Sequence, residues 1–250
     1  MRSVDAAPQG TPAGPTEARG AVAPAPDGST RGRILDAAVL RFARSGFDAS
    51  VRSIAADSAV SPALVIHHFG SKDRLREACD AHVLAWIVEA KRQNMTKATS
   101  GRLFEVLANA EGFAPLVGYV LRSLQSGGAV GRAFLEHMIE DAETYTAEAV
   151  ADGIVKPSRD ERARVRYLVY SSLGAMLLSL TMNPPEDPED VNAAVRTFMD
   201  DLYLPMLELY TEGFLTTRRM LDDYLLYVPD PPAGAPAPTD GTPHHDEEEP

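Results

Sequence analysis

Several features are scarce or missing in this 250-residue sequence, and each absence excludes a class of protein. Cys79 is the single cysteine, so the chain has no intrachain disulfide and fits a reducing cytosol. The first residues lack the basic start and apolar stretch of a secretory signal. The most apolar run, 167–182, is shorter than a membrane span and contains several serines. We therefore expect a cytoplasmic protein without a membrane partner.

Motifs of catalysis and metal binding are also missing. The sequence contains no G-x-S-x-G, no phosphate-binding glycine loop and no Cys–His pair in the context of a nucleophile. The possible metal ligands form three groups: His67, His68 and His82; Glu136, His137, Glu140 and Glu143; His244 and His245. Neighbouring histidines on a helix point to different sides, and a solvated charged surface explains the acidic group better than a metal site does. We expect no enzyme activity, no metal and no cofactor.

The two ends of the chain are poor in large apolar residues. Residues 1–28 are rich in proline, alanine and glycine, and residues 229–250 hold six acids with no lysine or arginine. Such segments cannot offset the entropy cost of ordering, so both are predicted to be disordered tails. About 200 residues remain between them, which is enough to build a sizeable core.

The charge of the chain is unevenly distributed. The net charge is −12, which by itself argues against a nucleic-acid partner. Residues 31–76, however, hold eight basic residues against four acids, a net charge of +4, so the rest of the chain carries −16. A basic module on an acidic body fits a DNA reader joined to a separate sensor, although solvated helix surfaces would give the same distribution.

Residues 50–72, SVRSIAADSAVSPALVIHHFGSK, are typical of two short helices joined by a tight turn. Ser50 is a favourable N-cap for the first helix, and Ser61 followed by Pro62 is a favourable start for the second. Gly70 ends the second helix. This arrangement predicts a helix-turn-helix whose second helix enters the DNA major groove.

The remaining sequence is also helical in pattern, and no β-hairpin signal interrupts it. The other expected helices span 30–45, 71–93, 101–111, 113–125, 130–152, 158–182, 190–210 and 217–227. Pro205 is expected to kink or divide the penultimate helix. The predicted fold class is all-α.

Three short patterns match a known family. RILDAAVLRFARSGFDASVRSIA is followed by AVS and then by HHFGSKDRL, in the right order and at the right separations, within residues 30–88. On these residues the chain resembles the TetR/AcrR family of bacterial transcriptional regulators. The resemblance implies a three-helix DNA-binding domain over 29–88, with its motif at 50–69, and a larger helical ligand-sensing and dimerisation domain over 89–228.

The resemblance also implies which residues contact double-stranded DNA. The expected contacts are Ser50, Arg52, Ser61, Pro62, Ala63, Leu64, His67, His68 and Lys72. Arg52 suits either a guanine edge or a phosphate, and Lys72 is either a phosphate clamp or an ordinary exposed lysine. His67 has strong hydrogen-bonding atoms for the groove, whereas partial burial is an equal alternative for His68. Many relatives carry a tyrosine in place of Ile66, so backbone N–H groups and the two cations are expected to carry more of the affinity.

Apolar residues of the body have two possible uses that the resemblance implies. The first is a small-molecule effector site among the helices between residues 101 and 182. Its candidate lining is Trp86, Phe104, Phe113, Tyr119, Phe134, Met138 and Tyr167. The second is a homodimer interface through the last two long helices. Its candidates are Val165, Leu168, Leu173, Leu177, Val195, Phe198 and Leu202. Ordinary core is the alternative for all of these side chains.

The predicted function is a homodimeric transcriptional regulator, with repression favoured, that reads an inverted repeat with half-sites about one helical turn apart. A small-molecule effector would release it from DNA. The alternative is a helical dimer that binds protein partners and whose DNA-reading motif is weak or vestigial. Salt dependence separates the two, because a DNA reader releases counterions on binding and loses affinity steeply as salt rises.

Overall fold

The computed structural model describes residues 28–102, 105, 110–187 and 190–227. Every regular element within these ranges is helical, which confirms the predicted all-α class. The two predicted disordered tails lie outside the described residues, apart from Gly28. The helix expected over 101–111 also lies mostly outside them, and a 3₁₀ turn, η1 (Ala110–Phe113), follows the undescribed part.

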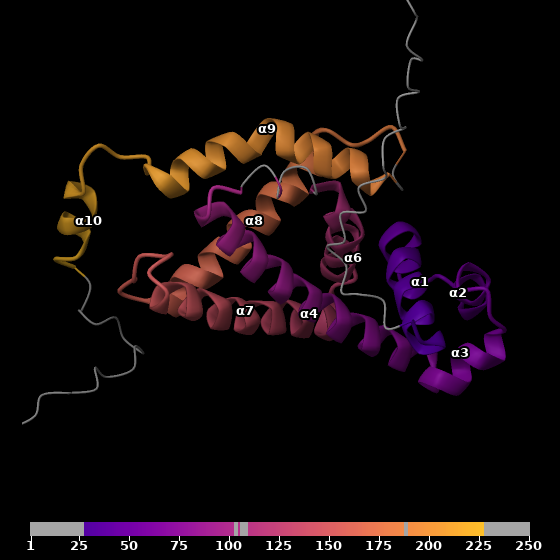
Figure 1. Cartoon of the computed structure of the whole chain (residues 1–250). Helices are drawn as coiled ribbons and strands as arrows, with labels where there is room; N and C mark the ends of the chain where they lie inside the picture. Colours follow the sequence, from indigo (N-terminus) through magenta and orange to yellow (C-terminus); the bar gives the residue numbers. More distant parts are fainter. Residues whose placement is uncertain (1–27, 103–104, 106–109, 188–189, 228–250) are drawn as a thin grey trace, which may run out of the picture.

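Helices α1 to α4 form a small head at one end of the molecule and lead into its body (Figure 1). They are α1 (Thr30–Ser45), α2 (Val51–Asp57), α3 (Pro62–Phe69) and α4 (Lys72–Thr99). The first three pack against one another, and α4 runs from them through the body.

The body consists of the second half of α4 and the helices that follow it. These are α6 (Ala114–Gln125), α7 (Gly128–Ala151), α8 (Glu161–Met182), α9 (Val191–Thr211) and α10 (Arg219–Tyr224). In Figure 1, α7 and α9 run along opposite sides of the body, and α8 crosses between them. α10 stands apart, beyond the end of α9.

Helix ends follow the capping residues. Ser29 accepts the backbone N–H of Gly32 at 3.0 Å and so starts α1 at the predicted place. Asp160 accepts the backbone N–H of Ala163 at 2.8 Å, so α8 begins at Glu161 rather than at 158. α4 continues to Thr99 rather than 93, because no glycine or proline interrupts it earlier.

α9 runs through Pro205 as one helix, so the predicted division at this residue is wrong. Proline removes one backbone donor and disturbs one carbonyl, but the hydrogen bonds on both sides remain.

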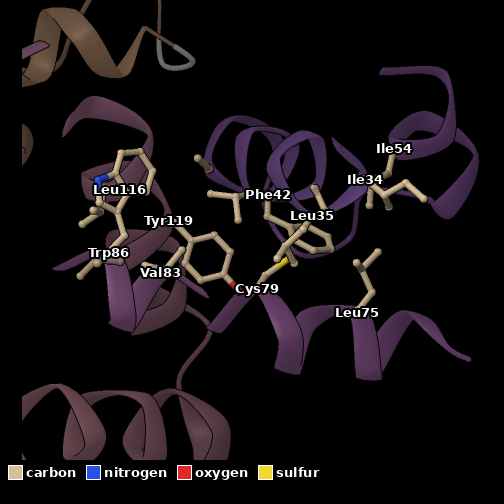
Figure 2. Packing of buried hydrophobic residues seen from close by; sticks show 14 of the residues in the cluster. Ile34, Leu35, Phe42, Ile54, Leu75, Cys79, Val83, Trp86, Leu116 and Tyr119 are labelled. Atoms are coloured by element: carbon tan, nitrogen blue, oxygen red, sulfur yellow. The ribbon is translucent and has the colours of Figure 1, made fainter. Parts of the chain in front are cut away.

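The head and the body share one hydrophobic core. Phe42 of α1 and Tyr119 of α6 are fully buried and meet edge to face, with ring centroids 6.5 Å apart. Cys79 and Val83 of α4 are buried in the same cluster, and Figure 2 shows Tyr119 between Val83 and Phe42. Because α1 packs directly on α6, the position of the head depends on the body.

The predicted interface residues of α8 and α9 divide by burial. Val165 and Val195 are only 2% and 4% exposed, so their own chain covers them and they are core rather than free surface. Leu177 is 41% exposed. The half-buried remainder comprises Leu168, Leu173, Phe198 and Leu202. α8 thus contributes one side to the body and leaves much of its surface open.

We predict that Phe42→Ala lowers the free energy of unfolding by about 3–5 kcal/mol, because it opens a cavity where α1, α4 and α6 meet. Leu40→Ala is the matched control on the same helix, since Leu40 is 40% exposed and its loss is expected to stay below about 1 kcal/mol. Urea unfolding monitored by circular dichroism measures both. Equal losses would contradict a core shared between head and body.

Candidate nucleic-acid interface

Serine caps fix the starts of α2, α3 and α4. Ser50, Ser61 and Ser71 each accept the backbone N–H three residues later, at 3.1, 3.2 and 3.1 Å. Pro62 occupies the first position of α3, where no intrahelical donor is needed. Helix starts carry partial positive charge and unpaired N–H groups, which suits them to phosphate.

The turn between α2 and α3 depends on one residue in the left-handed backbone region. Ala59 has a φ of 54°. The N–H of Val60 donates to the carbonyl of Ala55 at 2.9 Å, and the N–H of Ala59 donates to the carbonyl of Ala56 at 3.2 Å. Glycine usually occupies this position, so alanine is held there under strain. The turn sets the angle at which α3 leaves α2.

One side of α3 is buried and the other is open. Val65 and Phe69 are 1% and 6% exposed and anchor the helix in the core. The opposite side is formed by exposed Pro62, Ala63, Ile66 and His67, with Leu64 and His68 half-buried. α3 therefore presents a mainly apolar surface that carries two imidazole rings.

Basic side chains flank α3. Arg52 is exposed on the first turn of α2, and Lys72 is half-buried at the start of α4. The Arg31 guanidinium lies 4.8 Å from the ring centroid of Phe69, and this cation–π contact joins the start of α1 to the end of α3. Arg52 and Lys72 belong to the helices that precede and follow α3, and Arg31 contacts its last residue, so positive charge is concentrated in this part of the head.

An ion pair holds α2 against α1. The Arg41 guanidinium donates two hydrogen bonds to the Asp57 carboxylate, at 2.7 and 2.6 Å. This hydrogen bonding lowers the pKa of Asp57 from its ordinary value and keeps it charged. The paired geometry fixes the orientation of the two helices more than it adds stability, because both side chains are about one-third exposed.

Comparisons with known proteins agree with this geometry. The model described as "Bacterial regulatory proteins, tetR family" matches residues 34–79, and that described as "Tetracyclin repressor-like, C-terminal domain" matches residues 111–216. The HTH-type transcriptional regulatory protein RaaS of Mycobacterium tuberculosis is 44% identical over 199 residues, which cover 80% of this chain and 93% of that protein. The chain belongs to the TetR family. It is a DNA-binding transcriptional regulator, and α2 and α3 form its helix-turn-helix.

Two solved structures are similar at lower identity. A protein named as a fatty acid metabolism regulator of Clostridium perfringens is 18% identical, with a TM-score of 0.48, and the match covers 74% of this chain and 100% of that one. The TetR family regulator PfmR of Thermus thermophilus is 22% identical, with a TM-score of 0.40, and the match covers 68% of this chain and 98% of that one.

The residues predicted to contact DNA lie together in this TetR-family head. Ser50 and Arg52 start α2, Lys72 starts α4, and the other six lie on α3 or at its cap. Ser50 and Ser61 act as caps, as predicted. His68 is half-buried, which agrees with partial burial, the alternative to a DNA contact at this residue. The contact of Arg31 with Phe69 of α3 was not predicted, because the sequence shows the charge of Arg31 but not what this side chain packs against.

Polar contacts join the head to the body beside the shared core. The hydroxyl of Tyr119 in α6 donates to Oδ1 of Asp80 in α4 at 2.7 Å. The Arg122 guanidinium of α6 donates to the backbone carbonyl of Arg44 in α1 at 3.0 Å. α6 is thus bonded to both helices that position the DNA-reading motif.

Arg76 of α4 forms a second link. Its guanidinium lies 3.6 Å from the ring centroid of Phe47, just after α1, and donates to the Ser126 hydroxyl at 3.1 Å, at the end of α6. One side chain of α4 therefore contacts the ends of both neighbouring helices. A displacement of α6 would be transmitted through these contacts to α1 and α4.

The pKa values at this junction are shifted by burial. Burial raises the pKa of Asp80, while the hydrogen bond from Tyr119 and the charge of Arg76 oppose the rise. Burial also raises the pKa of Tyr119. A raised carboxyl pKa favours the protonated form in the folded state. The stability it contributes is therefore lost as the pH rises from about 3.8 through the folded pKa.

Most residues predicted to line an effector pocket lie in the core. The most buried are Trp86, Tyr119, Phe134 and Met138, which are 7%, 0%, 3% and 8% exposed. Phe113 packs against the same cluster, and Phe104 lies outside the described residues. Tyr167 is 69% exposed, so it does not line an enclosed pocket within one chain. Ordinary core, the alternative interpretation, fits the burial of these four residues, and their part in an effector site stays a prediction.

Two features near the body were not predicted. A hollow of about 470 Å³ lies along α9. It is lined by Ala110, Val195, Arg196, Met199, Asp200, Tyr203, Leu204 and Leu207. The indole Nε1 of Trp86 is buried without a hydrogen-bond acceptor among the described residues. A pattern of apolar residues in the sequence cannot show where a helix leaves space beside it.

We predict that Tyr119→Phe lowers the free energy of unfolding by about 1–3 kcal/mol, because it removes the only hydroxyl hydrogen bond described at the half-buried carboxyl of Asp80. Asp80→Asn keeps an acceptor oxygen, so its free energy of unfolding is expected to fall less than that of Asp80→Ala.

Since the pKa of Asp80 is raised, the stability of Asp80→Asn relative to the wild type should increase from pH 4 to pH 7. Urea unfolding across this range measures these differences, and a constant difference would contradict the shifted pKa.

Proposed function

We propose that the protein is a homodimeric repressor that occupies an inverted-repeat operator and leaves it when a small-molecule effector binds. The open side of α3, together with the capped helix starts and the basic side chains of the adjoining helices, is the observation that carries the DNA-reading role. Two copies related by a two-fold axis present two such helices, which suits half-sites about one helical turn apart.

The chemistry of each head residue suggests its contact. Ser50, Ser61 and Lys72 would meet phosphates through hydroxyl, backbone and ammonium donors. Arg52 would reach a guanine edge or a phosphate, and His67, with His68 beside it, would supply hydrogen bonds in the groove. Apolar groups at the start of α3, the exposed Pro62 and Ala63 and the half-buried Leu64, suit thymine methyls. Specificity would then depend on few polar contacts in each half-site.

Selection of binding sites from random duplex DNA is expected to enrich one inverted repeat. Arg52→Ala should weaken binding to that repeat about fivefold or more, since one bidentate base contact is worth about 1–3 kcal/mol. Arg162→Ala is the control, because it removes the same charge from an exposed position on the first turn of α8, at the end of the body away from the head (Figure 1). No enrichment at low salt would contradict the proposal and favour the protein-binding alternative.

An apolar stripe on α8 supports the homodimer. Tyr167, Tyr170, Leu177 and Leu178 recur at helical spacing and are 69%, 50%, 41% and 64% exposed. Gly174 lies in the same row, and a Cβ built there meets no atom within 4 Å, so a second helix has room to approach. A stripe of this kind on a soluble protein marks an interaction surface.

We predict that Leu178→Glu weakens the dimer at least tenfold, because the charge would be buried between two copies of α8 without a partner. Val130→Glu is the matched control, since Val130 is a 50% exposed apolar residue on α7, outside this stripe. Sedimentation velocity over a range of concentrations measures the dissociation constant. A monomer in the wild type would contradict the homodimer.

The effector and the cytoplasmic location rest on separate observations. The hollow along α9 and the buried Trp86 N–H without an acceptor among the described residues favour a ligand within the body.

α8 is, by length and composition alone, able to cross a membrane. It lies, however, within residues 111–216, which match the family's C-terminal domain. We therefore place the protein in the cytoplasm, with the open side of α8 covered by protein.

A further inference from the structure

The last described residues form an apolar segment that the body does not cover. From Glu208 to Tyr227, every residue except Leu225 is exposed. We refer to residues 213–227 as the C-terminal arm. The large apolar residues of the arm and their exposed fractions are Phe214 85%, Leu215 54%, Met220 64%, Leu221 48%, Tyr224 62%, Leu226 83% and Tyr227 87%. This density of exposed apolar side chains marks a docking surface.

The arm is directed away from its own chain. Gly213 has a φ of 81°, which ends α9 and turns the chain. Figure 1 shows α10 apart from the helices of the body, at the end where α8 begins. Arg219–Tyr224 is a six-residue helix with no buried residue, and helices this short are not stable alone in water. An additional surface is therefore needed to hold it.

We propose that the C-terminal arm packs on a second copy of this chain, beside the α8–α9 interface, so that the two arms are exchanged between protomers. This inference rests on the homodimer proposed above. Leu204, Leu209 and Tyr210 are 73%, 49% and 53% exposed, so the apolar surface of α9 continues directly into the arm. A two-fold axis along that surface would bring each arm to the partner's helices.

The charges on and after the arm favour a second copy of the chain over a polyanion as its binding partner. Arg218 and Arg219 pair with Asp222 and Asp223, at 3.0 and 3.8 Å, so the polar side of α10 is neutral. Residues 229–250, which follow the arm, hold six acids and no lysine or arginine. DNA and anionic membranes would be repelled, whereas an apolar protein surface would not. The family's C-terminal model ends at 216, so most of the arm lies beyond it.

Hydrogen exchange of the full-length protein tests the arm directly. Backbone amides of α10 should exchange at least tenfold more slowly at concentrations where the protein is dimeric than on dilution to monomer. The double variant Leu221→Gln, Tyr224→Gln should lose this protection and raise the dimer dissociation constant at least tenfold. Thr216→Gln, an exposed polar position in the same arm, should change neither.

The outcomes separate the arm from the homodimer. A wild-type dimer with unprotected α10 amides would overturn the arm exchange and leave the homodimer standing. A monomer at every concentration would overturn both. Protection that persists in monomeric Leu178→Glu would mean that the arm docks on its own body. Protection that requires anionic vesicles or duplex DNA would identify a different partner. Either of these last two results also overturns the exchange.

Discussion

The contact between Phe42 of α1 and Tyr119 of α6 governs the arrangement of this protein, because it makes the head and the body one packed unit. Close-packed interiors transmit displacements rather than absorb them. Tyr119 also bonds to Asp80 of α4, so movement of α6 reaches α1 and α4, the two helices that position the DNA-reading motif. In the proposed repressor, an effector need only shift α6 to change the separation of two heads.

Local features of the fold could be predicted from sequence because their causes lie within a few residues. Ser29, Ser50 and Ser61 cap helices at the positions expected, since a side-chain oxygen reaches a backbone N–H three residues away. The start of α8 was misplaced because Ser158 and Asp160 are both acceptable caps, and only the structure shows that Asp160 is used. Pro205 was expected to kink or divide its helix, and the division is absent because the loss of one backbone hydrogen bond does not end a helix whose other bonds remain.

Features that depend on distant residues could not be predicted. Val165 and Leu178 are apolar residues of the same helix, yet one is 2% and the other 64% exposed, and the pattern that places both on α8 is the same. Likewise, the sequence shows that Trp86 and Tyr119 are aromatic, but it does not show whether they line a cavity or fill a core. The contact of Arg31 with Phe69 needs the fold of the whole head. The sequence therefore predicted which residues cluster in the helix-turn-helix, but not what surrounds the apolar residues of the body.

The composition of α3 connects DNA reading to dimerisation. Its open side offers mostly apolar groups and few hydrogen bonds, so one head would discriminate weakly between sequences. The acidic remainder of the chain, which carries −16, opposes approach to DNA and leaves little non-specific attraction to compensate. Joining two heads rigidly makes the second contact intramolecular and so multiplies modest affinities. In the proposed homodimer, such a rigid connection would form through the uncovered surfaces of α8, α9 and the C-terminal arm, so an extensive pairing surface would compensate for a weak reading helix.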